Sequence, residues 1–344
     1  MKWIKVKPTD ARSWKFLVLR WALILALLLA GLMFITNMPN HSYAGPFQPL
    51  TADETTICDQ LRSHISTLAG TIGERNIWRY RELKAAEHYI AETFTKLGYS
   101  VEDQAFDSEG KEVKNLSVEV PGSSAPEEII IVGAHYDTVR GSPGANDNGS
   151  GVAALLEIAR LLREKKPART VRLVAFVNEE APFYHSNKMG SHIYASRSQE
   201  RGEQIVAMLS LETIGYYADE PGTQQYPPPF SFFYPSEGNF IGFVGNLGSQ
   251  ALVRKAIDSF RQHTEFPSEG LAAPDWITGI GWSDHWSFWK TGYEAIMITD
   301  TAPFRYPHYH TSQDTPDKID YPRTARVVNG ITKVIMDLAR IKPE

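Results

Sequence analysis

The sequence predicts an α/β protein: a doubly wound, mostly parallel (mixed) sheet flanked by helices, preceded by one N-terminal transmembrane helix. The sheet is predicted because short apolar, β-branched runs alternate along the chain with amphipathic helical stretches. The membrane helix is predicted because the run FLVLRWALILALLLAGLMFI, which starts at Phe16, is apolar except for Arg20 and is long enough to cross a bilayer.

The charges around this apolar run predict its orientation. Six basic residues lie within the first 20 positions, and no Lys or Arg follows until Arg62. By the positive-inside rule, the N-terminus stays cytoplasmic and the bulk of the chain is exported, as in a single-pass membrane protein. A cleaved signal peptide is the alternative, because Ser42-Tyr43-Ala44 resembles a small-x-small cleavage site. The predicted segments are a cytoplasmic basic tail (1–15), an anchor (16–36), a linker (37–50) and an exported domain (51–344).

The elements of the exported domain are predicted in chain order. Helices are predicted at residues 55–69, 80–97, 152–162, 249–263 and 323–341. Strands are predicted at residues 99–106, 113–120, 127–134, 170–177, 206–211 and 295–299. Residues 70–78 are predicted to form a loop, and the proline- and aromatic-rich stretch 216–234 a surface excursion near the functional site.

Composition excludes several kinds of partner and site. A net charge of −5 gives no reason to expect a nucleic-acid partner. Cys58 is the single cysteine, so the chain can form no internal disulfide and no thiolate metal cage. Any metal must therefore be held by His, Asp and Glu.

The first half of a metal site is predicted directly after the strand at 127–134. His135 and Asp137 follow it as H-x-D, and Asp147 lies in the glycine-rich loop that comes next. Open α/β sheets place their sites at such strand ends. Imidazole and carboxylate groups are ligands that zinc accepts.

Acids also follow the next two predicted strands. Glu179 and Glu180 come after the strand at 170–177, and Glu212 after the strand at 206–211. Carboxylates brought together at one sheet edge raise each other's pKa and oppose folding unless a positive charge lies among them. A pair of divalent metal ions would remove that conflict, whereas separate solvated loop acids are the simpler alternative.

The C-terminal part completes a set of motifs in a characteristic order. They are G-A-H-Y-D, N-D-N-G-S-G, N-E-E, L-E-T-I-G, S-D-H and H-T-x-x-D-T-P-D, which ends at Asp317. In this order they resemble the M28 family of zinc exopeptidases, which includes bacterial leucyl aminopeptidases and glutamate carboxypeptidases. The resemblance covers roughly residues 55 to 340 and implies a zinc-exopeptidase-like fold.

The resemblance implies a centre of two zinc ions bridged by Asp147. His135 and Glu212 would complete one zinc site, and Glu180 with His310 the other. Glu212 stands where most family members carry Asp, and Asn148 stands where many carry a second Asp. Glu179 would be the general base, and Asp137 the carboxylate that orients the His135 ring.

Other residues near the last motifs are less specific. Asp284 and His285 are expected to line the pocket or hold its loop. His310 is preferred to His308 because it directly precedes Thr311 in the matched motif. The aromatic side chains concentrated there could form a specificity pocket or part of the core; they are Trp276, Trp282, Trp286, Trp289, Tyr306 and Tyr309.

The resemblance therefore implies a metal-dependent exopeptidase acting on peptides, and we favour an aminopeptidase. A glutaminyl-peptide cyclotransferase with one zinc is the alternative enzyme, since Asp147, Glu179, Glu180 and His310 would serve it too. A non-catalytic ectodomain of the same fold is the third possibility. The sequence makes no prediction of oligomeric state.

Overall fold

The computed structural model describes residues 10–341, which divide into two compact units at Asn37 and Met38. The first unit contains helix α1 (Ala11–Thr36). Its stretch Trp14–Thr36 has a mean hydropathy of 2.5 and is long and apolar enough to cross a membrane, as a signal sequence would also be. The first nine residues of the predicted basic tail lie outside the described range.

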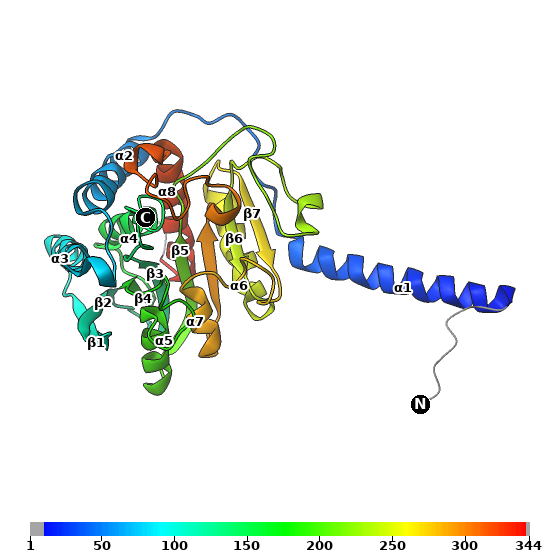
Figure 1. Ribbon diagram of the computed structural model, residues 1–344, viewed down its shortest axis with the longest axis horizontal. Coiled ribbons are helices and arrows are strands. Elements are labelled where there is room, and N and C mark those ends of the chain that lie inside the picture. The colour runs from blue at the N-terminus through cyan, green and yellow to red at the C-terminus, as the bar shows by residue number, and fades with distance from the viewer. Residues whose placement is uncertain (1–9, 342–344) are drawn as a thin grey trace. The chain divides into compact units, whose positions relative to one another are not determined.

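The second unit is built on an eight-stranded mixed sheet with the order β1-β2-β4-β3-β5-β8-β6-β7 (Figure 1). Strands β3, β4, β5 and β8 run parallel to one another, and β6 and β7 are parallel to each other. The pairs β1/β2, β2/β4 and β6/β8 are antiparallel. The strands are β1 (Glu102–Ser108), β2 (Lys111–Val120), β3 (Ala125–His135), β4 (Arg169–Phe176), β5 (Gln204–Glu212), β6 (Ile241–Gly245), β7 (Ser268–Ala272) and β8 (Ala295–Thr299).

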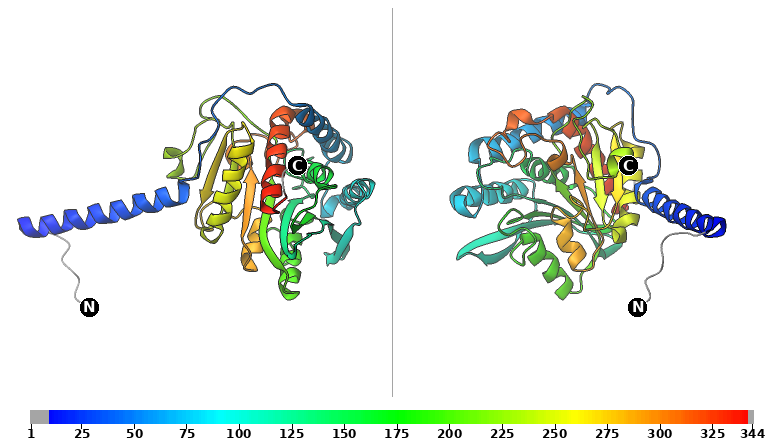
Figure 2. Two further views of the ribbon diagram at one scale, coloured as in Figure 1. Left: turned by 180° about the vertical axis from the view of Figure 1, so that it is seen from behind. Right: turned by 45° about the vertical axis from the view of Figure 1, so that its right-hand side comes forward.

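Helices cover both faces of this sheet (Figure 2). The larger core lies on one face, where alternate strand residues such as Ile130 and Val132 pack against α2, α3, α4, α6 and α8. The smaller core lies on the other face, where Ile131 and Phe176 pack against α5 and α7. The helices are α2 (Ala52–Ile65), α3 (Tyr80–Lys96), α4 (Gly149–Leu162), α5 (Gly190–Glu200), α6 (Gln250–His263), α7 (His285–Lys290) and α8 (Tyr321–Leu338).

Most predicted elements are present, with ends that differ by a few residues. The predicted loop at 70–78 is partly helical, because a π-helix continues α2 through Ser66–Ile72 and a 3₁₀ turn forms at Ile77–Arg79. Among the described residues, two strands (β6 and β7) and two α-helices (α5 and α7) were not predicted. Strands β6 and β7 have five residues each and contain glycine, so their sequences show little β-branched alternation.

Residues 38–47 of the predicted linker pack as a strap along β7, the last strand of the sheet. Met38 packs so closely on Gly270 of β7 that a Cβ at this glycine would lie only 2.8 Å from Met38 Cγ. Ser42 Oγ accepts a hydrogen bond from Ser268 N at 2.9 Å. Arg261 on α6 donates to the carbonyl groups of Pro39 and Asn40, both at 2.9 Å. The strap therefore covers the β7 edge of the sheet.

His64 on α2 gives the fold a testable dependence on pH. The side chain is buried, and its Nδ1 lies 2.7 Å from the Tyr89 hydroxyl. Burial, reinforced by the charge of Arg160, lowers the pKa of His64 to about 4. The unfolded chain takes up this proton below pH 6.5, whereas the folded chain does so near pH 4, so stability is lost as the pH falls between these values.

Between pH 7 and pH 5, we expect the free energy of unfolding to fall by about 2 kcal/mol more in the wild type than in His64→Gln. Denaturant titrations at the two pH values measure this difference. His88→Gln, on the exposed face of α3, is the matched control and should keep the wild-type pH dependence. Equal losses in wild type and His64→Gln would contradict the prediction.

Candidate metal centre

Four of the predicted site residues lie at the carboxyl ends of three neighbouring parallel strands. His135 is the last residue of β3, and Glu212 is the last residue of β5. Glu179 and Glu180 follow the end of β4. Because β3, β4 and β5 are parallel, these ends meet at one edge of the sheet.

Asp147 joins two groups of potential ligands. Its Oδ1 lies 3.4 Å from His135 Nε2, which is 3.2 Å from Glu212 Oε2. Its Oδ2 lies 3.0 Å from His310 Nε2, which is 3.3 Å from Glu180 Oε1. In each group, one donor atom per residue lies within 4.8 Å of the others, a spacing that could hold a metal ion.

The electrostatics of this cluster fit a bound cation. Burial and the nearby charge of Asp147 raise the pKa of Glu180 to about 7. Burial also raises the pKa of Glu179 well above its usual range, and the charges of Glu212 and Glu180 add to the rise. His135 Nε2 has no hydrogen-bond partner among the described residues. Divalent metal ions would neutralise these carboxylates and give His135 Nε2 a ligand role, so the donor set fits the metal that the sequence implied.

Asp137 lies beneath the cluster and connects β3 to β4. Its Oδ1 accepts a hydrogen bond from Glu179 N at 3.1 Å, and its Oδ2 accepts one from Glu180 N at 3.2 Å. The ring Nδ1 of His135 lies 3.2 Å from the Asp137 carbonyl oxygen and 3.6 Å from its carboxylate. The Asp137 carboxylate therefore holds the backbone of both glutamates, whereas the His135 ring lies nearer to the Asp137 carbonyl oxygen than to this carboxylate.

Two further residues hold the loop that carries Asp147: Asp314, a fixed position of the motif H-T-x-x-D-T-P-D, and Arg75, which the sequence did not single out. Asp314 accepts from Asn146 N at 2.8 Å through one oxygen and from Asp147 N at 3.0 Å through the other. Arg75 is fully buried and donates to the carbonyl groups of Pro143 and Gly144. The predicted motif contains Asp314 without assigning it a role, whereas nothing in the sequence distinguishes Arg75 from a solvated loop charge.

An amide and a hydroxyl side chain also hold the segments that carry Asp147 and Glu212. Asn148 donates to Leu211 O at 2.8 Å, and its Oδ1 accepts from Thr213 N at 3.1 Å, so it connects the Asp147 loop to the end of β5. Ser283 donates to Glu212 Oε2 at 2.7 Å. An aspartate at position 148 could not donate to Leu211, which gives the amide a definite function.

The remaining predicted residues separate into different environments. Asp284 is buried close to the cluster, and burial raises its pKa to about 7. His285 is buried on α7, with its Nε2 2.8 Å from Ile280 O, and it belongs to neither group of potential ligands. Of the aromatic residues, Trp282 and Tyr309 line a pocket, whereas Trp276 is 80% exposed.

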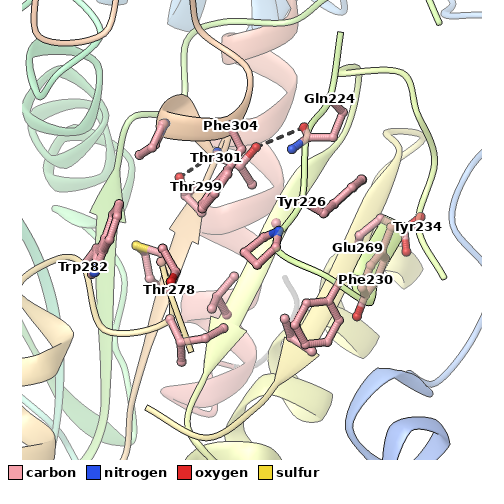
Figure 3. Close-up of a pocket in the computed structure, with 18 of the residues that line it drawn as sticks. Gln224, Tyr226, Phe230, Tyr234, Glu269, Thr278, Trp282, Thr299, Thr301 and Phe304 are labelled. Atoms are coloured by element: carbon pink, nitrogen blue, oxygen red, sulfur yellow. Dashed lines mark hydrogen bonds between the residues drawn. The ribbon is translucent and has the colours of Figure 1, made fainter. Parts of the chain in front are cut away.

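The pocket opens beside the two groups of potential ligands and is lined by residues of β8, β6 and β7 (Figure 3). It encloses about 820 Å³ of empty space, part of it open to solvent. Glu212 lies in its lining, and the predicted excursion at 216–234 forms one wall with Tyr226, Phe230 and Tyr234. Figure 3 shows Trp282 and Glu269 on opposite sides of this pocket.

Comparison with known proteins places the chain among peptidases. The model of peptidase family M28 matches residues 115–335. Protein YfbL of Escherichia coli K12, an uncharacterized protein, is 37% identical, and the alignment covers 80% of this chain and 87% of YfbL. An aminopeptidase of Pseudomonas aeruginosa is 32% identical over 55% of this chain, which spans about a third (34%) of that protein.

Solved structures share the fold at low sequence identity. The zinc aminopeptidase BSAP of Bacillus subtilis superposes with a TM-score of 0.64 and 18% identity, covering 83% of this chain and 95% of BSAP. A glutaminyl cyclase of Bacteroides thetaiotaomicron superposes with a TM-score of 0.61 and 20% identity, covering 81% and 97%. At these low identities, the two superpositions show that the chain shares the fold of these proteins.

Proposed function

This chain belongs to peptidase family M28, and from this membership and the geometry of its site we propose that it is an aminopeptidase with two zinc ions. The observation that carries the proposal is the position of Asp147, whose two oxygens each face one His-carboxylate pair. His135 and Glu212 would hold one ion, Glu180 and His310 the other, and Asp147 both. Relatives named aminopeptidases support the choice of the N-terminal end of a peptide as substrate.

The proposed reaction assigns a separate role to each acid. Two adjacent zinc ions polarise a peptide carbonyl and lower the pKa of a bound water. Glu179, whose Oε2 lies 3.8 Å from His135 Nε2, is placed beside the ligand groups and belongs to neither of them. It would accept the proton of the attacking water and pass it to the leaving amine. Asp137 holds the backbone of Glu179 and so positions this base.

We propose further that α1 anchors the enzyme in a membrane with the catalytic unit on the exported side. Support comes from the apolar length of α1 and from the basic residues at its N-terminal end, with none between Arg20 and Arg62. The substrate would then be a peptide outside the cytoplasm.

Metal content and substrate turnover of the full-length chain in detergent test the proposal together. We expect two zinc ions per chain by elemental analysis and release of p-nitroaniline from aminoacyl-p-nitroanilides. One zinc per chain with cyclisation of an N-terminal glutamine peptide would establish the cyclotransferase instead, for which Asp147, Glu180 and His310 suffice. A chain that binds no metal and turns over neither substrate would be a binding ectodomain.

A further inference from the structure

One row of residues crosses the sheet from the proposed metal centre to the edge strand β7. Glu212 on β5 is paired in register with Thr299 on β8. Thr299 is paired in turn with Gly242 on β6, and Gly242 with Glu269 on β7. Paired residues of neighbouring strands direct their side chains to the same face, and all four residues line the pocket.

The row leaves a trough between Thr299 and Glu269 because the residue between them is a glycine. Thr299 and Glu269 are two strand spacings apart, or about 10 Å. Gly242 places no side chain of its own between them, and the Thr301 methyl group borders this space, 3.5 Å from where a Cβ on Gly242 would lie. An extended lysine or arginine side chain could reach along such a trough, whereas a leucine side chain ends well short of Glu269.

The far end of the trough carries a negative charge that is only partly balanced. The Glu269 side chain is 23% exposed, and its Oε2 lies 3.9 Å from Arg261 Nη2. That nitrogen donates to Ser268 O at 2.6 Å, and Arg261 Nη1 donates to the strap carbonyls. Burial raises the pKa of Glu269, against the opposing charge of Arg261 and a hydrogen bond from Ser42 on the strap. A second cation at this carboxylate would therefore be favoured.

Aromatic rings line the trough on the way to Glu269. Phe230 and Tyr234 lie beside Glu269, and Tyr226 lies next to them (Figure 3). Such walls suit the apolar stem of a long side chain, and their ring faces attract a cationic group.

We propose that this trough binds the side chain of the substrate's N-terminal residue and that Glu269 selects arginine or lysine at that position. The inference rests on the proposed aminopeptidase activity and specifies its substrate class. A guanidinium or ammonium group at the end of the trough would form a charge-assisted hydrogen bond with the Glu269 carboxylate. Methionine, which is long but uncharged, would fill the same space without this interaction.

The test compares hydrolysis of arginine, lysine and methionine p-nitroanilides by the full-length enzyme. We expect the wild type to prefer arginine and lysine to methionine in kcat/KM. In Glu269→Gln, the ratio of kcat/KM for arginine to that for methionine should fall by roughly 10- to 100-fold, because a hydrogen bond to a charged group is lost. The matched control is Glu265→Gln, an exposed glutamate four residues earlier, which should keep the wild-type ratio.

The outcomes separate this inference from the function on which it rests. If Glu269 serves only to hold Arg261 and the strap, Glu269→Gln will lower thermal stability and leave the substrate ratio unchanged, which overturns the inference. A wild type that prefers methionine overturns it as well, with the aminopeptidase activity intact. A wild type that hydrolyses none of the substrates overturns the proposed function and this inference with it.

Discussion

Replacing Glu179 with glutamine is expected to lower kcat by roughly 10²- to 10⁴-fold, the usual contribution of a general base, while the metal content stays at the wild-type level. Glutamine keeps the size of the side chain but cannot accept the proton of the attacking water. Metal is retained because Glu179 belongs to neither group of potential ligands. Steady-state kinetics and elemental analysis of the same preparation measure kcat and the metal content together.

Glu180→Gln is the matched control for this prediction, because it makes the same change at the adjacent residue. Glu180 Oε1 lies 3.3 Å from His310 Nε2, within the second group of potential ligands. Its replacement should therefore reduce the metal content as well as the rate. Loss of metal from Glu179→Gln would make Glu179 a ligand, and unchanged kcat would exclude it as the base.

Asp147→Asn is expected to have the largest effect, because one substitution weakens both proposed zinc sites. An amide offers one oxygen where the carboxylate offers two, and the two oxygens of Asp147 face His135 and His310 separately. We expect less than two zinc ions per chain after dialysis. Metal affinity should fall by more than the roughly 10- to 100-fold that follows loss of a residue outside the ligand set.

The metal-free Asp147→Asn chain should be less stable than the metal-free wild type. Although burial opposes it, the hydrogen bonds from His135 and His310 hold the pKa of the Asp147 carboxyl well below its usual range, so the amide variant loses a charge that stabilises the folded state. Denaturant unfolding in the presence of a chelator measures this comparison. The matched control is Asp317→Asn, the same change at an exposed residue of the 3₁₀ helix Pro316–Lys318, and this variant should bind two zinc ions. A stable Asp147→Asn enzyme with full metal content would contradict the shared-ligand assignment.

The fold class and the family could be predicted from the sequence, and both are confirmed. The reason is physical: parallel strands that each end in a polar residue bring those residues to one edge. His135, Glu180 and Glu212 could therefore be grouped from their positions directly after predicted strands. The metal ligands and the base remain predictions. The structure adds that the side chains of the proposed ligands lie together around Asp147.

The roles of other residues at the site could not be predicted from the sequence. Arg75 and Asp314 act through hydrogen bonds to backbone groups distant in the chain, and such contacts impose no local pattern, although Asp314 itself stands in the quoted motif. Glu269 lies in the short strand SEGLA, whose residues resemble those of a loop. Glu269 lies in one row with Glu212 because of the order of the strands in the sheet. That order depends on the antiparallel pairing of β6 with β8, which the sequence does not predict.

The strap along β7 makes the resistance of the enzyme to aggregation depend on the N-terminal segment. An uncovered edge strand offers unpaired backbone groups to other chains and invites aggregation. Cleavage after Ala44 would place Met38, Pro39, Asn40 and Ser42 on the released peptide, although these residues contact β7 and Arg261. A soluble form that begins at Thr51 would lack the same cover, whereas one that begins at Met38 would keep its sheet edge protected from intermolecular strand pairing.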